Sequence, residues 1–355
     1  ATNELRESRP LLRAMFRALA LAATALAQKE LAQELADLGL DSVLRFEAGL
    51  GRAAASEAAN ANLPVVMMHG MGDYATNPMG MISIKNNIEK VANTYVHSVE
   101  LCSDKSKLAN CAHEDQSNGF FMTMDDQVDQ FARVVQADEK LKAGFNAIGF
   151  SQGNTVIRGY IHKYNNPPVK TFVSMHGVLM GVNGLPQCPM EVPGVGILCR
   201  AVDAIISHAG VYTSFVQNHL AQANYYRDAA NLKEYRADGH FLPYINNEVE
   251  GQENATYKKN FQSLEKLVLV MAEDDTMVHP KESEHFGYFK DGTRTEIVAM
   301  KDAPWYTEDW FGLKSLDQQK KIDFFSTPGN HLRFTGDFLL KMVKTYFAQQ
   351  EAVMV

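Results

Sequence analysis

The sequence lacks any cluster of basic residues. Its 34 Lys and Arg are scattered along the chain and are outnumbered by 42 Asp and Glu, for a net charge of −8. Because nucleic-acid binding needs a concentrated basic face to neutralise phosphates, no nucleic-acid partner is expected. Cysteine is also scarce, with four in 355 residues, which excludes a small disulfide-rich scaffold. The 46% of apolar residues allows one large core or two small ones, and the chain is too rich in aromatic residues, at 10%, for disorder.

Long hydrophobic runs are few, and the one near the start of the chain is interrupted by charge. Residues 11–27 read LLRAMFRALALAATALA, which is too short and too charged for a comfortable membrane span. The basic, apolar and small-x-small zones are typical of a secretory signal, and the alternative is an Ala-rich helix retained on the protein. We expect residues 1–62 to be a signal-like helical segment with a linker, and residues 63–355 to form the globular domain.

Strand-like and helical patterns alternate in that domain. Buried strands are predicted at 63–68, 95–101, 145–150, 171–174, 267–271 and 297–300, and helices at 125–141, 155–164 and 334–349. This alternation predicts an α/β fold with a mostly parallel central sheet and helices on both faces. Residues 185–250 show helical patterns without a buried strand, so we expect an inserted helical cap there.

The segment GFSQG provides the candidate nucleophile. Gly149, Ser151 and Gly153 form a G-x-S-x-G pattern directly after a predicted strand and before the amphipathic segment 155–164. A serine on a tight strand-to-helix turn needs small residues two before and two after it, because side chains there would collide with the neighbouring strand and helix. The pattern predicts an α/β-hydrolase fold with Ser151 as nucleophile. The alternative is an ordinary serine in a Gly-rich turn.

A serine nucleophile needs a histidine base and an acid, in the chain order Ser, Asp or Glu, His for this fold. His331 is the candidate base, because its loop follows the last predicted strand and precedes the final helix. The acid is expected just after strand 267–271, where Asp274 and Asp275 both lie and Glu273 is a third candidate.

The sequence HGMGD at 69–73 follows the first predicted strand and is the candidate oxyanion loop. A Gly-bracketed turn there allows a backbone N–H to point at the substrate oxygen on which negative charge develops. The N–H groups of Met71 and Gln152 are the predicted oxyanion hole. His69 is interpreted as structural, orienting the loop rather than accepting the serine proton.

Several of these segments together resemble the palmitoyl-protein thioesterase family, over about residues 64–347. The resemblance rests on HGMGD at 69–73, GFNAIGFSQG at 144–153, GVNGLPQCP at 181–189, FGYF at 286–289, FGLK at 311–314 and GNHL at 329–332. Matched position by position, it implies Ser151, Asp275 and His331 as the catalytic triad, with no cofactor and no metal. Asn154 departs from the second glycine that the family usually has, and the loop at 105–118 is longer and more polar.

The resemblance implies hydrolysis of thioester-linked palmitate from protein cysteines through an acyl-serine intermediate. The partners would be S-acylated proteins or peptides and fatty acyl thioesters, with peripheral contact to membrane or lipid, and the cap would line an apolar groove. Two alternatives share much of this reasoning. One is a hydrolase of lipid oxygen esters, and the other is a protein that binds acyl chains without cleaving them.

The cysteines fall into two close pairs, which suggests an oxidising compartment. The resemblance implies a Cys188–Cys199 bridge, whereas Cys102 and Cys111 have no counterpart in the family and their pairing stays open. Asn254 begins the sequence Asn-Ala-Thr, an acceptor for N-glycosylation. These features predict a lysosomal or secreted protein, and the alternative is a cytosolic protein with four free thiols.

Overall fold

The computed structural model describes residues 62–102, 108–184 and 210–348, together with residues 200, 204 and 206. The predicted signal-like segment lies outside these residues except for Asn62, and so do Cys188 and Cys199. The domain boundaries and the Cys188–Cys199 bridge therefore stay predictions. No helix in the described part of the chain is long and apolar enough to cross a membrane.

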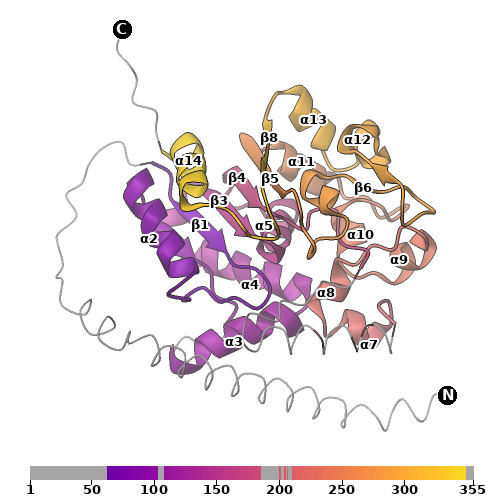
Figure 1. Ribbon diagram of the computed structural model, residues 1–355, viewed down its shortest axis with the longest axis horizontal. Helices are drawn as coiled ribbons and strands as arrows, with labels where there is room; N and C mark the ends of the chain where they lie inside the picture. The colour runs from indigo at the N-terminus through magenta and orange to yellow at the C-terminus, as the bar shows by residue number, and fades with distance from the viewer. Residues whose placement is uncertain are drawn as a thin grey trace. The chain divides into compact units, whose positions relative to one another are not determined.

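Six parallel strands form the central sheet, in the order β2-β1-β3-β4-β5-β8 (Figure 1). Their bounds are β1 Val65–Met68, β2 Val96–Ser98, β3 Phe145–Phe150, β4 Val169–Met175, β5 Lys266–Ala272 and β8 Ile322–Thr327. A separate antiparallel pair consists of β6 Tyr288–Phe289 and β7 Ile297–Val298. The predicted α/β fold with a mostly parallel sheet is confirmed.

Helices cover both faces of the sheet. Successive residues of β1 belong to different core clusters, with Val65 and Met67 on one face and Val66 and Met68 on the other. Helices α2 and α14 pack on the first face and lie side by side in Figure 1, and α4 and α5 pack on the second. Their bounds are α2 Met81–Ala92, α4 Met124–Ala137, α5 Gln152–Lys163 and α14 Gly336–Tyr346.

The remaining helices are short. Within residues 210–250 the structure has four of them: α7 Ser214–Gln217, α8 Ala221–Asn224, α9 Leu232–Asp238 and α10 Leu242–Ile245. Most of 185–209 lies outside the described residues, so the inserted cap at 185–250 stays a prediction. Beyond them lie α11 Ala255–Gln262, α12 Pro304–Thr307 and α13 Leu313–Gln318. Short 3₁₀ turns are η3 Glu139–Leu141, η4 Lys281–His285 and η5 Met300–Asp302.

The last strand of the sheet differs from the sequence prediction. Residues 297–300 were expected to be a buried strand, but Ile297 and Val298 belong to the small antiparallel pair. The sheet ends instead on β8, which the sequence analysis missed. As an edge strand, β8 is buried at its two ends and alternates between half-buried and exposed positions in between, and Phe324 is 41% exposed. A search for continuous apolar runs overlooks this alternating pattern.

The expected loop at 105–118 is also corrected, because its residues 108–118 belong to helix α3, Leu108–Phe121. The many polar residues of this helix gave no clear helical pattern, although Asp115 and Phe120 are fully buried. Cys111 lies on α3 and forms a disulfide with Cys102. The pairing that the sequence left open is therefore a Cys102–Cys111 bridge.

Candidate active site

The site lies where the strand order reverses. Strand β1 has β2 on one side and β3 on the other, so the loops that follow β1 and β3 leave the same edge of the sheet side by side. In parallel α/β sheets, ligands bind outside the carboxyl ends of the strands at such a switch point. The HGMGD loop follows β1, and Ser151 follows β3.

Ser151 occupies a strained turn between β3 and α5. Its φ of 53° is positive, which is unusual for a residue with a side chain. A Cβ on Gly149 would lie 2.5 Å from Asn154 Oδ1, and one on Gly153 would lie 2.4 Å from Met68 O. Both positions therefore require glycine, for the steric reason that the sequence pattern suggested.

His331 bridges Ser151 and Asp275. Its Nε2 lies 2.8 Å from Ser151 Oγ, and its Nδ1 lies 2.5 Å from Asp275 Oδ2. Asp275 Oδ1 accepts hydrogen bonds from the N–H groups of Met277 and Val278, each at 2.7 Å. The structure thus brings together three side chains from the loops that follow β3, β5 and β8.

Of the three candidate acids, Asp275 is the one that reaches His331. Glu273 instead accepts a hydrogen bond from Ser326 at 2.6 Å, and Asp274 is exposed. Burial alone would raise the pKa of Asp275, but its hydrogen bond and charge interaction with His331 lower the pKa overall. Asp275 is therefore a carboxylate at neutral pH, as an acid that orients a base must be.

The HGMGD loop lies against the nucleophile, since a Cβ on Gly70 would be 3.0 Å from Ser151 Cβ. His69 Nε2 contacts Asp115 Oδ1 at 2.9 Å, and its Nδ1 contacts the carbonyl oxygen of Gly70 at 2.9 Å. Burial alone would lower the pKa of His69, but Asp115 raises it to about 9. His69 is thus a buried, charged group that holds the loop, in agreement with its structural interpretation.

The side chain of Gln152 is fixed by hydrogen bonds to α3 and to residues in and directly after α8. Its Nε2 donates to Gly119 O at 2.8 Å, and its Oε1 accepts from Tyr225 OH at 2.9 Å and from Gln222 Nε2 at 3.1 Å. These contacts hold the first residue of α5 beside the HGMGD loop. The roles of the Met71 and Gln152 N–H groups as an oxyanion hole stay predictions.

Comparison with known proteins gives the family. The family model described as palmitoyl protein thioesterase matches residues 64–331. The chain belongs to this family. It is 39% identical to "Palmitoyl-protein thioesterase 1" of Caenorhabditis elegans over 81% of this chain and 93% of that protein. It is 36% identical to "Palmitoyl-protein thioesterase 3" of Dictyostelium discoideum over 77% and 86%. A protein named lysosomal thioesterase from Xenopus laevis is 33% identical over 52% and 62%.

Asn154 is where this member of the thioesterase family departs from the usual glycine, and it contacts the nucleophile turn. Its Nδ2 donates to the carbonyl oxygens of Ser151, at 3.1 Å, and Met175, at 3.0 Å. Both acceptors are backbone carbonyls, so the amide of Asn154 contacts the turn and not the side chains of Ser151, Asp275 or His331. The amide ties the backbone of the turn to the end of β4.

His176, at the end of β4, is a site residue of this thioesterase-family chain that the sequence analysis did not single out. Its Nδ1 accepts the N–H of Leu332 at 2.8 Å, so its Nε2 carries the proton that it donates to Thr327 Oγ1 at 2.9 Å. Burial, followed by the nearby His331, lowers the pKa of His176 to about 4. A neutral His176 therefore anchors the loop that carries His331. Its position after a strand of the same sheet was the available signal.

His176, Asp275 and His331 offer ligand atoms within 4.8 Å of one another, a spacing that a metal ion could bridge. Hydrogen bonds already use these atoms, since His331 Nδ1 contacts Asp275 Oδ2 and His176 Nδ1 accepts from Leu332. The arrangement of this family member suits proton transfer from Ser151. The absence of a metal and of a cofactor stays a prediction.

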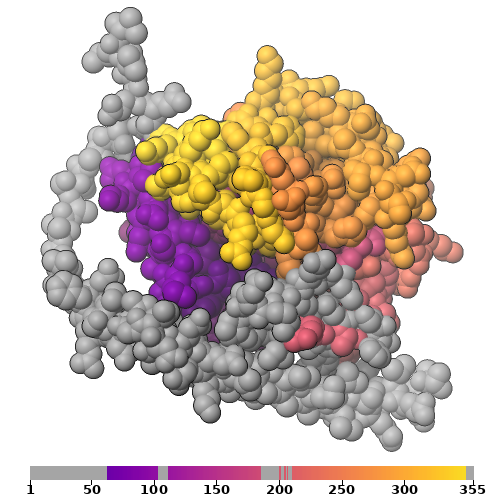
Figure 2. All heavy atoms as spheres, in the orientation of Figure 1, coloured from indigo at the N-terminus to yellow at the C-terminus, as the bar shows by residue number. Residues whose placement is uncertain are grey.

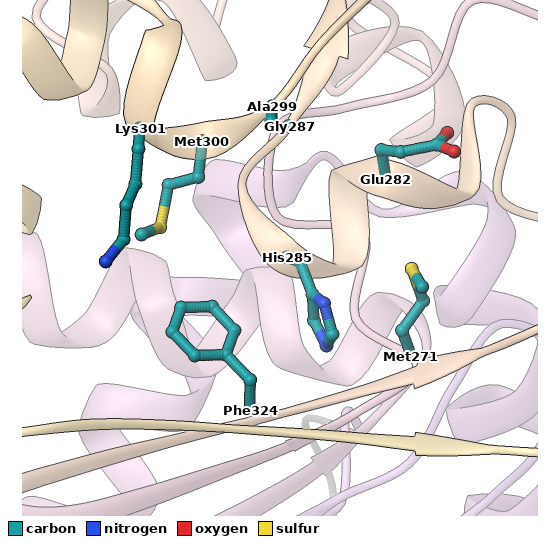
Figure 3. Close-up of a pocket in the computed structure, with 8 residues that line it drawn as sticks. All are labelled: Met271, Glu282, His285, Gly287, Ala299, Met300, Lys301 and Phe324. Carbon is teal, nitrogen blue, oxygen red and sulfur yellow. The ribbon is translucent and has the colours of Figure 1, made fainter.

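A cavity of about 270 Å³ lies elsewhere in the domain, against β5 and β8. Figure 3 shows His285, Met300 and Phe324 around it, and its other lining residues are Met271, Glu282, Gly287, Ala299 and Lys301. Ser151, Asp275 and His331 do not line this cavity. It is therefore not the acyl groove beside Ser151, and the residues that line the groove stay unassigned.

Proposed function

We propose that this chain hydrolyses the thioester bonds that link palmitate and other long acyl chains to protein cysteines. The observation that carries the proposal is the continuous hydrogen-bonded series Ser151–His331–Asp275 in a member of the palmitoyl protein thioesterase family. The two most similar relatives described above are both named palmitoyl-protein thioesterases. Ser151 is the proposed nucleophile, His331 the base and Asp275 the group that orients the base.

In the first half of the proposed reaction, Ser151 Oγ attacks the thioester carbonyl carbon while His331 Nε2 takes the hydroxyl proton. Asp275 stabilises the imidazolium, and the N–H groups of Met71 and Gln152 stabilise the oxyanion. The carbon–sulfur bond then breaks, and the departing thiolate takes the proton from His331. A thiol with a pKa of about 8.5 is a good leaving group and needs little acid assistance.

In the second half, His331 takes a proton from water, and the resulting hydroxide attacks the acyl carbon. The bond between that carbon and Ser151 Oγ breaks, the proton returns to Oγ, and the free fatty acid leaves. Each step balances with water as the co-reactant.

A palmitoyl chain requires an apolar groove beside Ser151. Burying its methylenes yields on the order of 10 kcal/mol before ordering costs, at about 0.8 kcal/mol each. The short helices of the cap, which contact the first turn of α5 through Gln222 and Tyr225, are the proposed wall of this groove. Contact with a membrane or with lipid is part of the same proposal, since the acylated substrates are themselves lipidated.

A lysosomal or secretory location is proposed on two observations. Disulfides such as Cys102–Cys111 persist in oxidising compartments, and the Xenopus laevis relative is named a lysosomal thioesterase. Asn254, the candidate glycosylation site, is partly exposed at the start of α11. Its Oδ1 caps the helix by accepting the N–H groups of Thr256 and Tyr257, which leaves Nδ2 out of both bonds.

Two peptides of one sequence test the reaction class, one carrying palmitoyl-cysteine and the other palmitoyl-serine. We expect faster release of palmitate from the thioester, and none from either peptide with Ser151→Ala. Equal or faster release from the oxygen ester would favour the oxygen-ester hydrolase. Binding of both peptides without turnover, and without labelling of Ser151 by a fluorophosphonate, would favour the acyl-binding protein.

A further inference from the structure

Behind Asp275 lies a second carboxyl group, that of Glu284, which the mechanism above does not use. Glu284 belongs to the 3₁₀ turn η4 and is fully buried. Within the described residues it forms no ion pair with a Lys, Arg or His. An acidic side chain in such a place is costly to ionise, and it calls for an explanation.

The hydrogen bonds of Glu284 indicate its protonation state. Its Oε2 accepts the N–H of Ala272, at the end of β5, at 2.9 Å. With the carboxyl ionised, its buried Oε1 has no donor to bond. A proton on Glu284 would give this carboxyl group a donor, and the neighbouring carboxylate with which it interacts is Asp275. Protonation therefore satisfies a group that would otherwise be buried without a partner.

The pKa shifts of the two carboxyl groups agree with a proton on Glu284. Burial, followed by the charge of Asp275, raises the pKa of Glu284 to about 11. The interactions with His331 and Glu284 act in the opposite direction on Asp275 and lower its pKa despite burial. Two adjacent carboxyl groups that share one proton behave in this way, since one becomes the donor and the other keeps the negative charge.

We propose that Glu284 is a positioning residue, a neutral carboxylic acid that donates a hydrogen bond to Asp275 and so extends the series Ser151–His331–Asp275 by one member. The proposal rests on the proposed function, because it assigns Glu284 a role in the same site. Asp275 is then held by the N–H groups of Met277 and Val278, by His331 and by Glu284. A single negative charge stays on Asp275, opposite the imidazolium that forms during the reaction.

The other side of η4 contains a suitable control. Glu282 and His285 both line the cavity of Figure 3, whereas Glu284 does not. Glu282 thus lies on the same short turn, and its charge contributes less to the raised pKa of Glu284 than burial and Asp275 do. The titratable groups around the Asp275–Glu284 pair are His331, His176, Glu282 and, beyond His176, His285.

The test measures the rate at which a fluorophosphonate labels Ser151 between pH 4.5 and 9 in the full chain. The variants are Glu284→Gln, Glu284→Leu and the control Glu282→Gln. The probe reacts with an activated serine whatever the natural substrate is. If the wild-type protein is not labelled at all, the proposed function fails; if it is labelled, the variants test Glu284 alone.

The amide of Glu284→Gln can still donate to Asp275 and accept from Ala272. We therefore expect its labelling rate to stay within about threefold of wild type. The pH at which labelling reaches half of its maximal rate, the half-maximal pH, should be unchanged, as in Glu282→Gln. Leucine removes the donor, which makes Asp275 a stronger partner for the imidazolium. For Glu284→Leu we expect slower labelling and a half-maximal pH that rises by about 0.5 to 1 unit.

Two results would overturn the proposal. A half-maximal pH that falls in Glu284→Gln would mean that an ionised Glu284 had been neutralised, and an unshifted profile in a folded Glu284→Leu would mean that Glu284 only fills space. If Glu284→Leu does not fold, the infrared difference between wild type and Glu284→Gln decides. It should contain the carbonyl stretch of a protonated carboxyl group at pH 7, and its absence would refute the neutral state.

Discussion

Two histidine–aspartate pairs differ in what the second ring nitrogen of the histidine faces; one begins the HGMGD loop that packs against Ser151, and the other contacts Ser151 directly. His69 contacts Asp115 through Nε2, and His331 contacts Asp275 through Nδ1. The other nitrogen of His69 faces the carbonyl oxygen of Gly70, whereas that of His331 faces the hydroxyl of Ser151. The His69 side chain is 1% exposed, and that of His331 is 10% exposed.

The group that faces the second ring nitrogen distinguishes the structural pair, His69 and Asp115, from the proposed catalytic pair, His331 and Asp275. A carbonyl oxygen only accepts hydrogen bonds, so His69 donates from both nitrogens and is held as an imidazolium. The raised pKa of His69, about 9, agrees with this, and a charged His69 cannot take a proton from serine. A hydroxyl can donate as well as accept, so His331 can be neutral and act as a base.

The largest expected effect comes from replacing each histidine with glutamine. His331→Gln should lower kcat by about 10⁴ to 10⁶ because the base is lost, with little change in the free energy of unfolding. His69→Gln should lower kcat far less but should destabilise the protein. Kinetics with an acyl thioester and urea unfolding of both variants measure this contrast. Similar losses of kcat in the two variants would remove the distinction between the pairs.

A smaller loss is expected from changing the carboxylate of the proposed catalytic pair. In Asp275→Asn the amide can donate to His331 and hold the ring in the wrong tautomer, so kcat should fall by about 10⁴. Asp274→Asn is the matched control and should stay near wild type. Wild-type kcat in Asp275→Asn would move the role to Asp274 or Glu273.

The pair of His69 and Asp115 should make the free energy of unfolding depend on pH. The pKa of His69 is raised in the folded state, so its pair with Asp115 stabilises the protein fully below about pH 6.5, and this contribution is lost as the pH rises through about 9. The stability difference between wild type and His69→Gln should shrink by on the order of 3 kcal/mol over this window. Urea unfolding from pH 6 to 10 measures it, and a constant difference would contradict the charged state of His69.

The smallest expected effect concerns the disulfide on the helix that carries Asp115. The Cys102–Cys111 bridge closes a loop with a sequence separation of nine residues, so the double variant Cys102→Ser/Cys111→Ser should lose about 2 to 3 kcal/mol of unfolding free energy. Its kcat should stay within a few-fold of wild type, because neither cysteine is among the hydrogen-bond partners of Ser151, Asp275 and His331 in the described residues. A loss of kcat comparable to that of His331→Gln would show that α3 controls the catalytic pair as well.

The parts of the site that the sequence predicted are those encoded locally. The glycines around Ser151 are required for steric reasons within a stretch of five residues. The loop that carries Asp275 follows an apolar strand, and the loop that carries His331 precedes the final helix. The supports of the site depend on distant contacts. Neither His176 nor Glu284 belongs to a sequence motif. The role of His176 follows from its contacts with Leu332 and Thr327. The role of Glu284 follows from its interactions with Ala272 and Asp275. The edge strand β8 was missed because its apolar residues do not form a continuous buried run, and two of its six residues, Phe324 and Ser326, are exposed.

The most direct test of the account is to trap the acyl-enzyme. Wild-type protein mixed with a palmitoyl thioester, quenched in acid and digested, should yield a palmitoylated peptide that carries the acyl group on Ser151, as measured by mass spectrometry. The same peptide from Ser151→Ala should be unmodified, and that variant should release no palmitate. An acyl group on another residue, or undiminished turnover in Ser151→Ala, would contradict the assignment of Ser151 as the nucleophile activated by His331.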